Sequence, residues 1–410
     1  MVVRIEKPEF NLRDKLSQLD RRVGSTGGEI LASKSPEDVQ RLIGVGSRNM
    51  IINGGMMVAQ RGTSNTPQGG SNTQYPCVDR WGGQFSSPSN TFTVSQSTDA
   101  PVGHAYSLKF LTNSAVSPSG VHYYHIGQNI EGNVFSATGW NASASGRTKT
   151  PQPCTLSFWV KSSNPGKWCV VLKGQGNHTH SYLIVYEIQK PDTWEWKTHT
   201  IYPSPEITNW TTGTSTAMRI QFDVGTSRVS DLGSNIIGEW RNHNTYTYNN
   251  SKFQTTRIHG ISGATWYLTG VQFEPGPVAT PFEHRTYGDV LMNCYRYYVK
   301  MFTNTSDYPF GYGYKYANGA FAMSVPLPTK LRATPSAAFS GLRIRGGNTS
   351  GSNQEDDVTG LGGMSYSNAN FQSFTANSST NNTSIGQAVV LTNSVSNNTS
   401  YIIFDSEAGY

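Results

Sequence analysis

The feature that most constrains the fold is a two-residue alternation of apolar and polar side chains between residues 49 and 288. In "TLSFWVKS" it places Leu156, Phe158 and Val160 on one side of a strand, and "YLIVYEI" and "MRIQFDV" repeat the pattern. A period of two indicates a β-strand with one buried face. Turn-forming stretches such as "SSNPGKW" separate these runs at short intervals, which favours antiparallel hairpins over parallel βαβ units. We therefore predict a central jelly-roll β-sandwich over residues 49–288.

A boundary follows in "VQFEPGPVATPFEHRTYGDVLMNCYRYYVKM", residues 271–301. Pro275 and Gly276 end a strand, and the prolines that follow stiffen the exit. The segment "DVLMNCYRYYV" predicts a short helix that leads into a new strand. Alternation then resumes in "GAFAMSVPLP", "QAVVLTNSV" and "SYIIFDSEAG". A block of about 120 residues can hold its own core, so we predict a carboxy-terminal β-sandwich domain over residues 289–410.

The first 48 residues differ because their apolar side chains recur with helical spacing. Asn11 can cap a helix that Gly24 ends, and its apolar seam consists of Leu12, Leu16, Leu19 and Val23. A seam of fewer than two heptads is too short to hold a coiled coil alone. We expect residues 1–48 to dock on a larger particle and to support a homotrimer; the alternative is a plain surface helix.

Composition argues against several classes of protein. The formal net charge of +6 is spread thinly, without a run of five or more Lys and Arg, so we expect no nucleic-acid partner. No window approaches the ~20 apolar residues of a membrane span, and the amino terminus lacks the apolar core of a signal peptide. We expect no membrane insertion, and we expect the protein to be made in a cytoplasm. The cysteines show no CxxC spacing, which favours buried small apolar residues over metal ligands or disulfides: Cys77, Cys154, Cys169 and Cys294.

The usual catalytic motifs do not occur in the sequence. It contains no G-x-S-x-G, Walker loop, H-E-x-x-H or dinucleotide glycine fingerprint. Glu187 and Asp223 lie on polar faces of separate expected strands and would have to converge to act as a glycosidase pair; solvated surface charges are the favoured interpretation. His178 and His180 would point the same way on a strand, as a metal pair would, but a third ligand is not evident. We predict no catalytic residues, no metal and no cofactor.

Aromatic residues offer the best candidates for binding. They make up 11% of the chain, and an exposed ring on a sandwich can stack on the C–H face of a sugar. The alternation places Trp159 opposite the core-facing side chains of its strand. The candidate contacts for a glycan or a partner are Trp159, Trp194, Trp196, Trp210 and Trp240. For each of them, packing in the core or at a subunit interface is the alternative.

An order of motifs resembles that of a known group of proteins. The motifs are "NMIINGGMMVAQRGTS", "YPCVDRW", "LSFWVKSS", "WYLTGVQFEPGPVATPFEHRTYGDVLMNCYRYY" and "VPLPTKLRATPS". They resemble bacteriophage virion proteins, particularly tail-fibre and head-fibre proteins, in patches from about residue 4 to 335. The opening "IEKPEFNLRDKLSQLD" is similar to openings of structural proteins from phages of marine bacteria, including cyanophages. The resemblance implies a jelly roll of the carbohydrate-binding-module type and a place in the virion.

We therefore expect a non-enzymatic virion protein, in the first instance a tail fibre that contributes to attachment through a host surface glycan. Residues 1–48 would bind other virion proteins. One alternative is a capsid-decoration or head-fibre protein that projects from the head or cements it. Another, of a different class, is a glycan-cleaving tailspike enzyme, which requires two carboxylates that face a cleft.

Overall fold

The computed structural model describes residues 48–67, 70–85, 91–116, 124–140, 151–174, 180–205, 207, 209–225, 237–242, 253–303, 305, 308–347, 353–364, 371–393 and 400–407. Contacts along the chain separate Met1–Asn49 from Met50–Tyr410, and the fold below is that of the second unit. Leu12, Leu16, Leu19 and Val23 lie outside the described residues, so the helical anchor stays a prediction.

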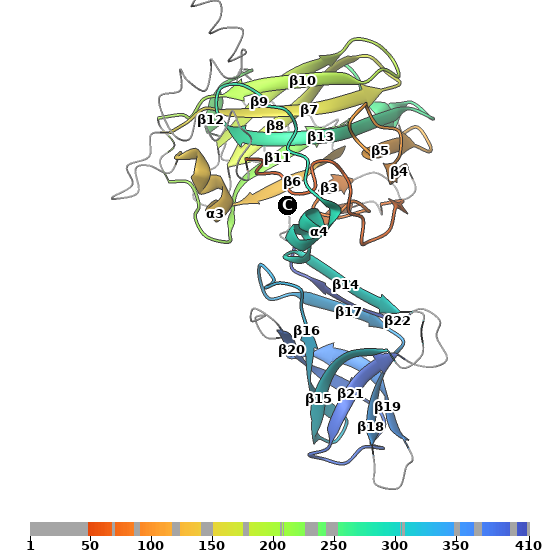
Figure 1. The fold of residues 1–410 in the computed structure, drawn as a ribbon. Helices are drawn as coiled ribbons and strands as arrows, with labels where there is room; N and C mark the ends of the chain where they lie inside the picture. The colour runs from red at the N-terminus through yellow and green to blue at the C-terminus, as the bar shows by residue number, and fades with distance from the viewer. Residues whose placement is uncertain are drawn as a thin grey trace, which may run out of the picture. The chain divides into compact units, whose positions relative to one another are not determined.

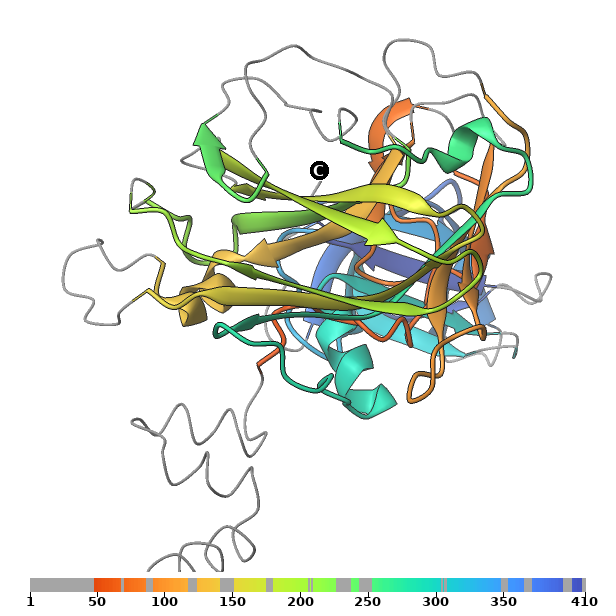
Figure 2. The same cartoon turned by 90° about the horizontal axis from the view of Figure 1, so that it is seen from above.

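Strands β1 to β13 form two antiparallel sheets (Figure 1). The six-stranded sheet has the order β1 (Ser64–Asn65), β4 (Phe92–Ser97), β5 (Ser107–Thr112), β13 (Thr265–Pro275), β7 (Cys154–Ser162) and β10 (Glu195–Ile201). The seven-stranded sheet has the order β12 (Trp240–Asn242), β9 (His180–Ile188), β8 (Gly166–Gly174), β11 (Thr216–Asp223), β6 (Tyr124–Glu131), β3 (Gly82–Phe85) and β2 (Gly70–Gln74). Figure 2 shows the long central strands, yellow to green, side by side.

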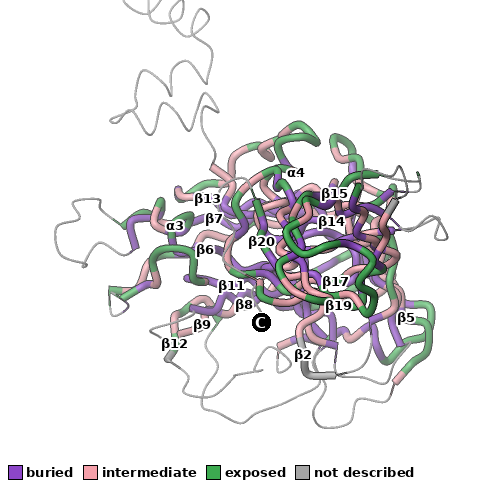
Figure 3. The backbone as a smooth tube through the Cα atoms, turned by 90° about the horizontal axis from the view of Figure 1, so that it is seen from below, coloured by how far each residue is buried: buried purple, intermediate pink, exposed green. Residues whose placement is uncertain are grey.

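The alternation explains how the two sheets share one core. Leu156, Phe158 and Val160 of β7 are buried, and they join one apolar cluster with residues from both sheets. Strands β8 and β11, inside the seven-stranded sheet, are buried almost throughout (Figure 3). Burial of this apolar surface is the main force that holds such sheets together. The prediction of a mainly β chain with a central sandwich is confirmed.

Helices are few and short among the described residues. They are α3 (Gly132–Phe135), η1 (Ser136–Thr138), η3 (Ile258–Gly260) and α4 (Tyr287–Tyr295). Within the described ranges, none of the helices has the length and apolar character that a membrane crossing requires. All four cysteines of the sequence are buried and none forms a disulfide, which confirms their role as small core residues.

The proline-rich boundary is held against β13 by a buried carboxylate. Glu274, which is fully buried, accepts hydrogen bonds from the Thr280 amide and hydroxyl at 2.8 and 2.7 Å. Helix α4 then begins after Thr286, whose hydroxyl accepts from the Asp289 amide at 3.2 Å. Strand β14 (Tyr298–Thr303) follows the helix. The expected short helix leading into a strand is therefore present.

The remaining strands differ from the expected second sandwich. A three-stranded sheet has the order β14, β22 (Ser400–Asp405) and β17 (Ser336–Ser340). The others close into a barrel in the order β15 (Pro309–Ala317), β16 (Ala320–Pro326), β20 (Phe371–Ser378), β19 (Asn353–Gly362), β18 (Leu342–Gly347) and β21 (Ala388–Asn393). Strand β21 closes it by pairing with both β15 and β18. Sandwich and barrel show the same inward and outward alternation, so the pattern of side chains does not reveal this closure.

Candidate functional site

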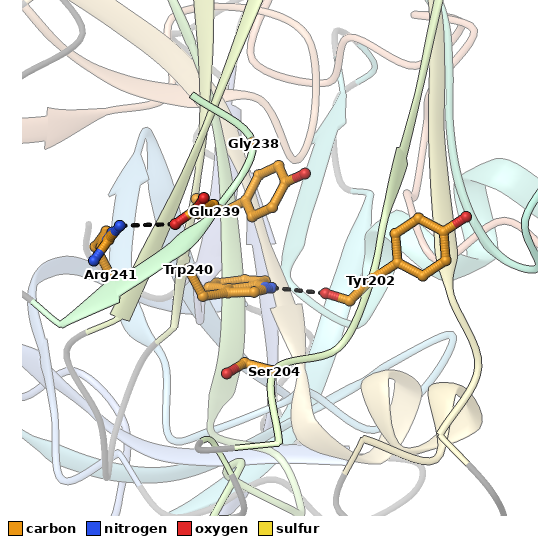
Figure 4. Close-up of a pocket in the computed structure, with 7 residues that line it drawn as sticks. Tyr202, Ser204, Gly238, Glu239, Trp240 and Arg241 are labelled. Carbon is orange, nitrogen blue, oxygen red and sulfur yellow. Dashed lines mark hydrogen bonds and ion pairs between the residues drawn. The ribbon is translucent and has the colours of Figure 1, made fainter. Parts of the chain in front are cut away.

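An open pocket of about 300 Å³ lies at the β12 edge of the seven-stranded sheet (Figure 4). Its lining combines three aromatic rings with hydroxyl and charged groups: Tyr182, Tyr202, Ser204, Gly238, Glu239, Trp240 and Arg241. These residues come from β9, from the segment after β10, and from β12 with the turn that leads into it. Three separate parts of the chain therefore have to fold before the pocket exists.

Strand β12 places the central aromatic residue. Trp240 is the register partner of Tyr182 on β9, so both side chains leave the sheet on the same face. The turn before β12 is fixed by Gly238, whose amide donates to the Leu183 carbonyl at 2.9 Å. Gly238 has a φ of +81°, a left-handed conformation that glycine adopts without steric cost. The backbone thus brings Trp240 to the edge of the sheet.

The indole of Trp240 is held in one orientation. Its Nε1–H donates to the Tyr202 carbonyl at 3.0 Å (Figure 4). Trp210 and Trp140 pack edge-on against it with ring-centroid distances of 5.5 and 5.8 Å. Edge-to-face pairs of this kind are favourable beyond the area that they bury. The pocket therefore has a rigid aromatic wall supported by a buried tryptophan cluster.

Tyr182 carries a polar group in this otherwise aromatic wall. Its hydroxyl lies 3.1 Å from Nε2 of His199 on β10, within hydrogen-bonding distance. Burial lowers the pKa of His199, which favours the neutral imidazole at physiological pH. Burial, with Glu239 and Tyr202 nearby, raises the pKa of Tyr182. Both groups are thus uncharged near neutral pH.

The rim of the pocket is polar and open to solvent. Tyr202 is 64% exposed, and Ser204 follows two residues later. The side chains of Glu239 and Arg241 form an exposed ion pair at 2.7 Å. The pair leaves further oxygen and N–H positions available for a ligand. Aromatic faces beside such groups suit a ligand that has C–H faces and hydroxyls, as sugars do.

The structure divides the five tryptophans of the sequence prediction into two groups. Trp240 lines the pocket, and Trp210 lies behind it, 3% exposed. Trp159 of β7 and Trp196 of β10 belong instead to the six-stranded sheet, and Trp194 directly precedes β10. Their role in binding stays a prediction, and Trp210 can contribute only through its packing on Trp240.

The second group lies on a different surface of the sandwich. Trp196 is 47% exposed and is the register partner of Trp159. Trp194 donates from Nε1 to Asp99 at 3.1 Å and lies 5.3 Å from Lys161 Nζ. The surface around Trp194 therefore includes charged side chains, and the indole is partly covered by them. None of these three rings is among the residues that line the pocket at β12.

The two carboxylates considered for catalysis do not share a cleft. Glu187 is exposed on β9, whereas Asp223 is fully buried on β11 and accepts from the Gly225 amide at 2.8 Å. Strand β8 lies between β9 and β11. The expectation that Asp223 is a solvated surface charge is wrong, because its carboxylate satisfies the backbone at the end of its strand.

A metal site is also absent from the described residues, where no three His, Cys, Asp or Glu side chains gather. His180 begins β9, but His178 lies outside the described residues. The prediction for this histidine pair is therefore open.

Sequence reasoning missed most of the pocket. Tyr182 looked like one more inward residue of an alternating strand, and Tyr202, Ser204, Glu239 and Arg241 lie at strand ends or in turns. The one local signal is Gly238 before "EWRN", which marks a turn into a strand. The contact between β9 and β12 is not local, so it could not be found from spacing.

No protein-family model matches the chain, and no curated protein matches it. Solved structures similar in part include the enzymatically active domain of tailspike protein 4 from bacteriophage CBA120, with 11% identity over 55% of this chain and a TM-score of 0.29. This chain spans only 21% of that structure. The CBM22-1 xylan-binding domain of Paenibacillus barcinonensis Xyn10C is 11% identical, with 57% of this chain and all of that domain covered and a TM-score of 0.25. At such low scores, function has to be argued from the pocket itself.

Proposed function

We propose that the chain is a non-enzymatic virion protein of a bacteriophage, a tail fibre that binds a carbohydrate on the host surface. The observation that carries the proposal is the pocket at β12. A fixed indole, an exposed phenol ring and a row of hydroxyl and charged groups meet there in one open site. The resemblance of the motif order to that of phage fibre proteins supports the assignment to a virion.

The pocket favours binding over cleavage. Glycoside hydrolysis generally uses two carboxyl groups separated by about 5–10 Å. Among the described residues that line this pocket, Glu239 is the single carboxylate, and it is paired with Arg241. His199 contacts the Tyr182 hydroxyl and is not among the residues that line the pocket. The described lining of the pocket therefore favours a site that holds a sugar over one that cleaves it.

The assignment to a fibre includes its assembly. In this proposal, residues 1–48 dock on other virion proteins, three copies associate, and the β units project towards the host. Gold-labelled antibody against residues 289–410, seen on intact particles by electron microscopy, would locate the protein. Label on the tail would support a tail fibre. Label over the head would contradict it and would favour a capsid-decoration protein.

The binding function is tested with a glycan array probed by wild-type protein and by Trp240→Ala. We expect the wild type to bind a restricted set of glycans and the variant to lose at least about tenfold in affinity, which is about 1.4 kcal/mol. Phe302→Ala is the matched control, because it removes a 74% exposed ring of β14 that is neither in the pocket nor among the candidate tryptophans, and it should bind as the wild type does. A wild type that binds no glycan overturns the proposal.

The same samples separate binding from cleavage. Glycans recovered after incubation should show no new reducing ends. Release of shorter sugars, lost on Glu239→Gln, would instead make the protein a glycan-cleaving enzyme.

A further inference from the structure

The outer face of the barrel carries a column of tyrosines that the pocket does not use. Tyr312, Tyr314 and Tyr316 alternate along β15 and are 60%, 53% and 48% exposed. Since successive outward residues on a regular strand are two apart, Tyr312 and Tyr314 lie about 7 Å from each other along it, whereas Tyr316 lies where the pairing of β15 with β16 is irregular. Within the described residues, none of the three hydroxyls makes a hydrogen bond to the protein. We call this set the tyrosine column.

The neighbouring strands leave the rings accessible. On β16, Ser324 and Ala322 are the register partners of Tyr312 and Tyr314. Directly opposite residues of an antiparallel pair project from the same face. Such small side chains cannot cover a phenol ring. The tyrosine column therefore borders a strip of the barrel surface on which the side chains are short.

The next strand provides hydrogen-bonding groups beyond that strip. Ser373 and Thr375 of β20 are the partners of Ser324 and Ala322, and Ser373 is exposed. Across β15, β16 and β20 the surface thus changes from aromatic rings to small side chains and then to hydroxyls. Rings on one side and hydroxyls on the other match the two kinds of contact that a sugar chain offers.

This surface is also free of charge. The outward residues of β15, β16 and β20 are Tyr312, Tyr314, Tyr316, Ala320, Ala322, Ser324, Pro326, Phe371, Ser373, Thr375 and Asn377. Charged side chains of the barrel lie on β18 and β19, where Arg343 and Arg345 are in ion pairs with Glu355 at 2.5 and 2.7 Å. Strand β21 separates β18 from β15, and the part of β19 that pairs with β20, residues 358–362, has no charged residue. The surface therefore fits a neutral ligand rather than an acidic one.

We propose that the tyrosine column is a second carbohydrate-binding surface, which takes an extended segment of a neutral glycan along β15. The inference rests on the proposed function only in taking a glycan as the ligand. A contact with another copy of the chain is the competing use of exposed rings. Contacts within permanent oligomers are more apolar than the average surface, whereas this strip has a hydroxyl group at Ser324, Ser373 and Thr375.

The test is affinity electrophoresis of the full chain in native gels that contain a neutral polysaccharide, with dextran, xylan, mannan and laminarin as separate probes. The variant is Tyr312→Ser with Tyr314→Ser. We expect it to raise the dissociation constant for the retarding polysaccharide about tenfold. Tyr312→Phe with Tyr314→Phe keeps the rings and should remain close to the wild type. Phe302→Ser is the matched control, because Phe302 is a 74% exposed ring on β14, outside the column.

The same tyrosine changes in a Trp240→Ala protein distinguish the tyrosine column from the pocket at β12. Protein with Trp240→Ala should retain weak retardation that the added Tyr312→Ser and Tyr314→Ser changes abolish. If the tyrosine variant is retarded as strongly as the wild type while Trp240→Ala is not, the second surface is overturned and the proposed function stands. If no polysaccharide retards the wild type, the second surface and the proposed function are both overturned.

The oligomeric state is measured for the same proteins by light scattering after size-exclusion chromatography. We expect the tyrosine variant to have the mass of the wild type. A smaller assembly would show that the tyrosine column joins copies of the chain, and this result overturns the inference even if binding is weakened.

Discussion

Arg80 of the sandwich forms a buried ion pair with Glu407, which lies 327 residues further along the chain. Their side chains are 2% and 3% exposed. The guanidinium of Arg80 also lies 3.4 Å from the centre of the Tyr297 ring, and its Nη2 donates to the Asn129 carbonyl at 2.8 Å. The segment that follows the last strand is thus joined to the sandwich by a buried ion pair.

Glu131 strengthens the same joint. Its carboxylate accepts from Arg296 at 2.8 and 3.1 Å and from the Tyr297 hydroxyl. Arg61 lies 3.6 Å from the centre of the Tyr298 ring and pairs with Asp405 at 3.1 Å. The residues after helix α4 therefore contact buried charged side chains of the sandwich. These contacts are a second source of rigidity for the proline-rich boundary.

Removal of one partner of the central pair should be costly. We expect Glu407→Gln to lower the free energy of unfolding by about 3–5 kcal/mol, because Arg80 stays buried without its counter-charge. Denaturant unfolding measures the change. Glu239→Gln is the control, since its half-exposed pair should contribute less than about 1 kcal/mol. Equal stability of Glu407→Gln and the wild type would contradict the account of the joint.

Acid should weaken the sandwich through His104. Burial, with His284 nearby, lowers the pKa of His104 from 6.5 to about 4. The unfolded chain binds this proton near pH 6.5, so stability that is present above pH 6.5 is lost as the pH falls towards 4. Melting temperatures over this range should fall more for the wild type than for His104→Gln. Parallel curves for the two proteins would be evidence against a neutral, partly buried His104.

The barrel should respond to acid at lower pH through Asp356. Burial alone would raise the pKa of Asp356, but hydrogen bonds from Thr380, Asn382 and Thr383 lower it below 3.8. The stability due to this carboxylate is therefore present above pH 3.8 and is lost as the pH falls through the lowered value. We expect Asp356→Asn to cost about 2 kcal/mol at pH 7 and progressively less below pH 3.8.

The neighbouring residue provides the control for that prediction. The side chain of Asp357 is 68% exposed and pairs with Arg343 at 3.0 Å. Asp357→Asn should change the unfolding free energy by less than about 1 kcal/mol. If both substitutions have equal effects in chemical denaturation at pH 7, the hydrogen bonds to Asp356 do not stabilise the barrel as proposed.

Deletion of residues 1–48 tests the predicted anchor. The truncated chain should keep the circular dichroism and melting behaviour of a β protein, because the cores described above lie beyond Asn49. It should no longer enter particles when it replaces the full chain during phage assembly. Normal incorporation, measured by quantitative immunoblotting of purified particles, would remove the anchor from the account.

The fold class could be predicted because alternation is a local property. Leu156, Phe158 and Val160 show the buried face of β7 within five residues, and the same holds for Phe321, Met323 and Val325 inside the barrel. Closure of the barrel depends on how β21 pairs with β15 and β18. Those partners are distant in sequence, and either a sheet or a barrel would bury the same side chains.

The site was predictable only in part for the same reason. Trp240 could be proposed from its residue type, but its pocket depends on the pairing of β12 with β9 and on the Tyr202 carbonyl. Nothing in the local spacing distinguishes Trp240 from Trp168 or Trp266, which are fully buried. Whether a tryptophan is exposed depends on which strands or loops pack over it. Neither the composition nor the two-residue alternation of the sequence specifies that packing.

Fluorine NMR of protein labelled with 5-fluorotryptophan tests most directly whether the pocket at β12 binds sugar. The chain has nine tryptophans, and a Trp240→Phe variant assigns the signal that matters. On titration with a glycan that the protein binds, we predict that the Trp240 signal shifts first and furthest, while the signals of Trp168 and Trp266 stay in place. A titration that moves only Trp159, Trp194 or Trp196 would place binding on the other sheet and contradict the account.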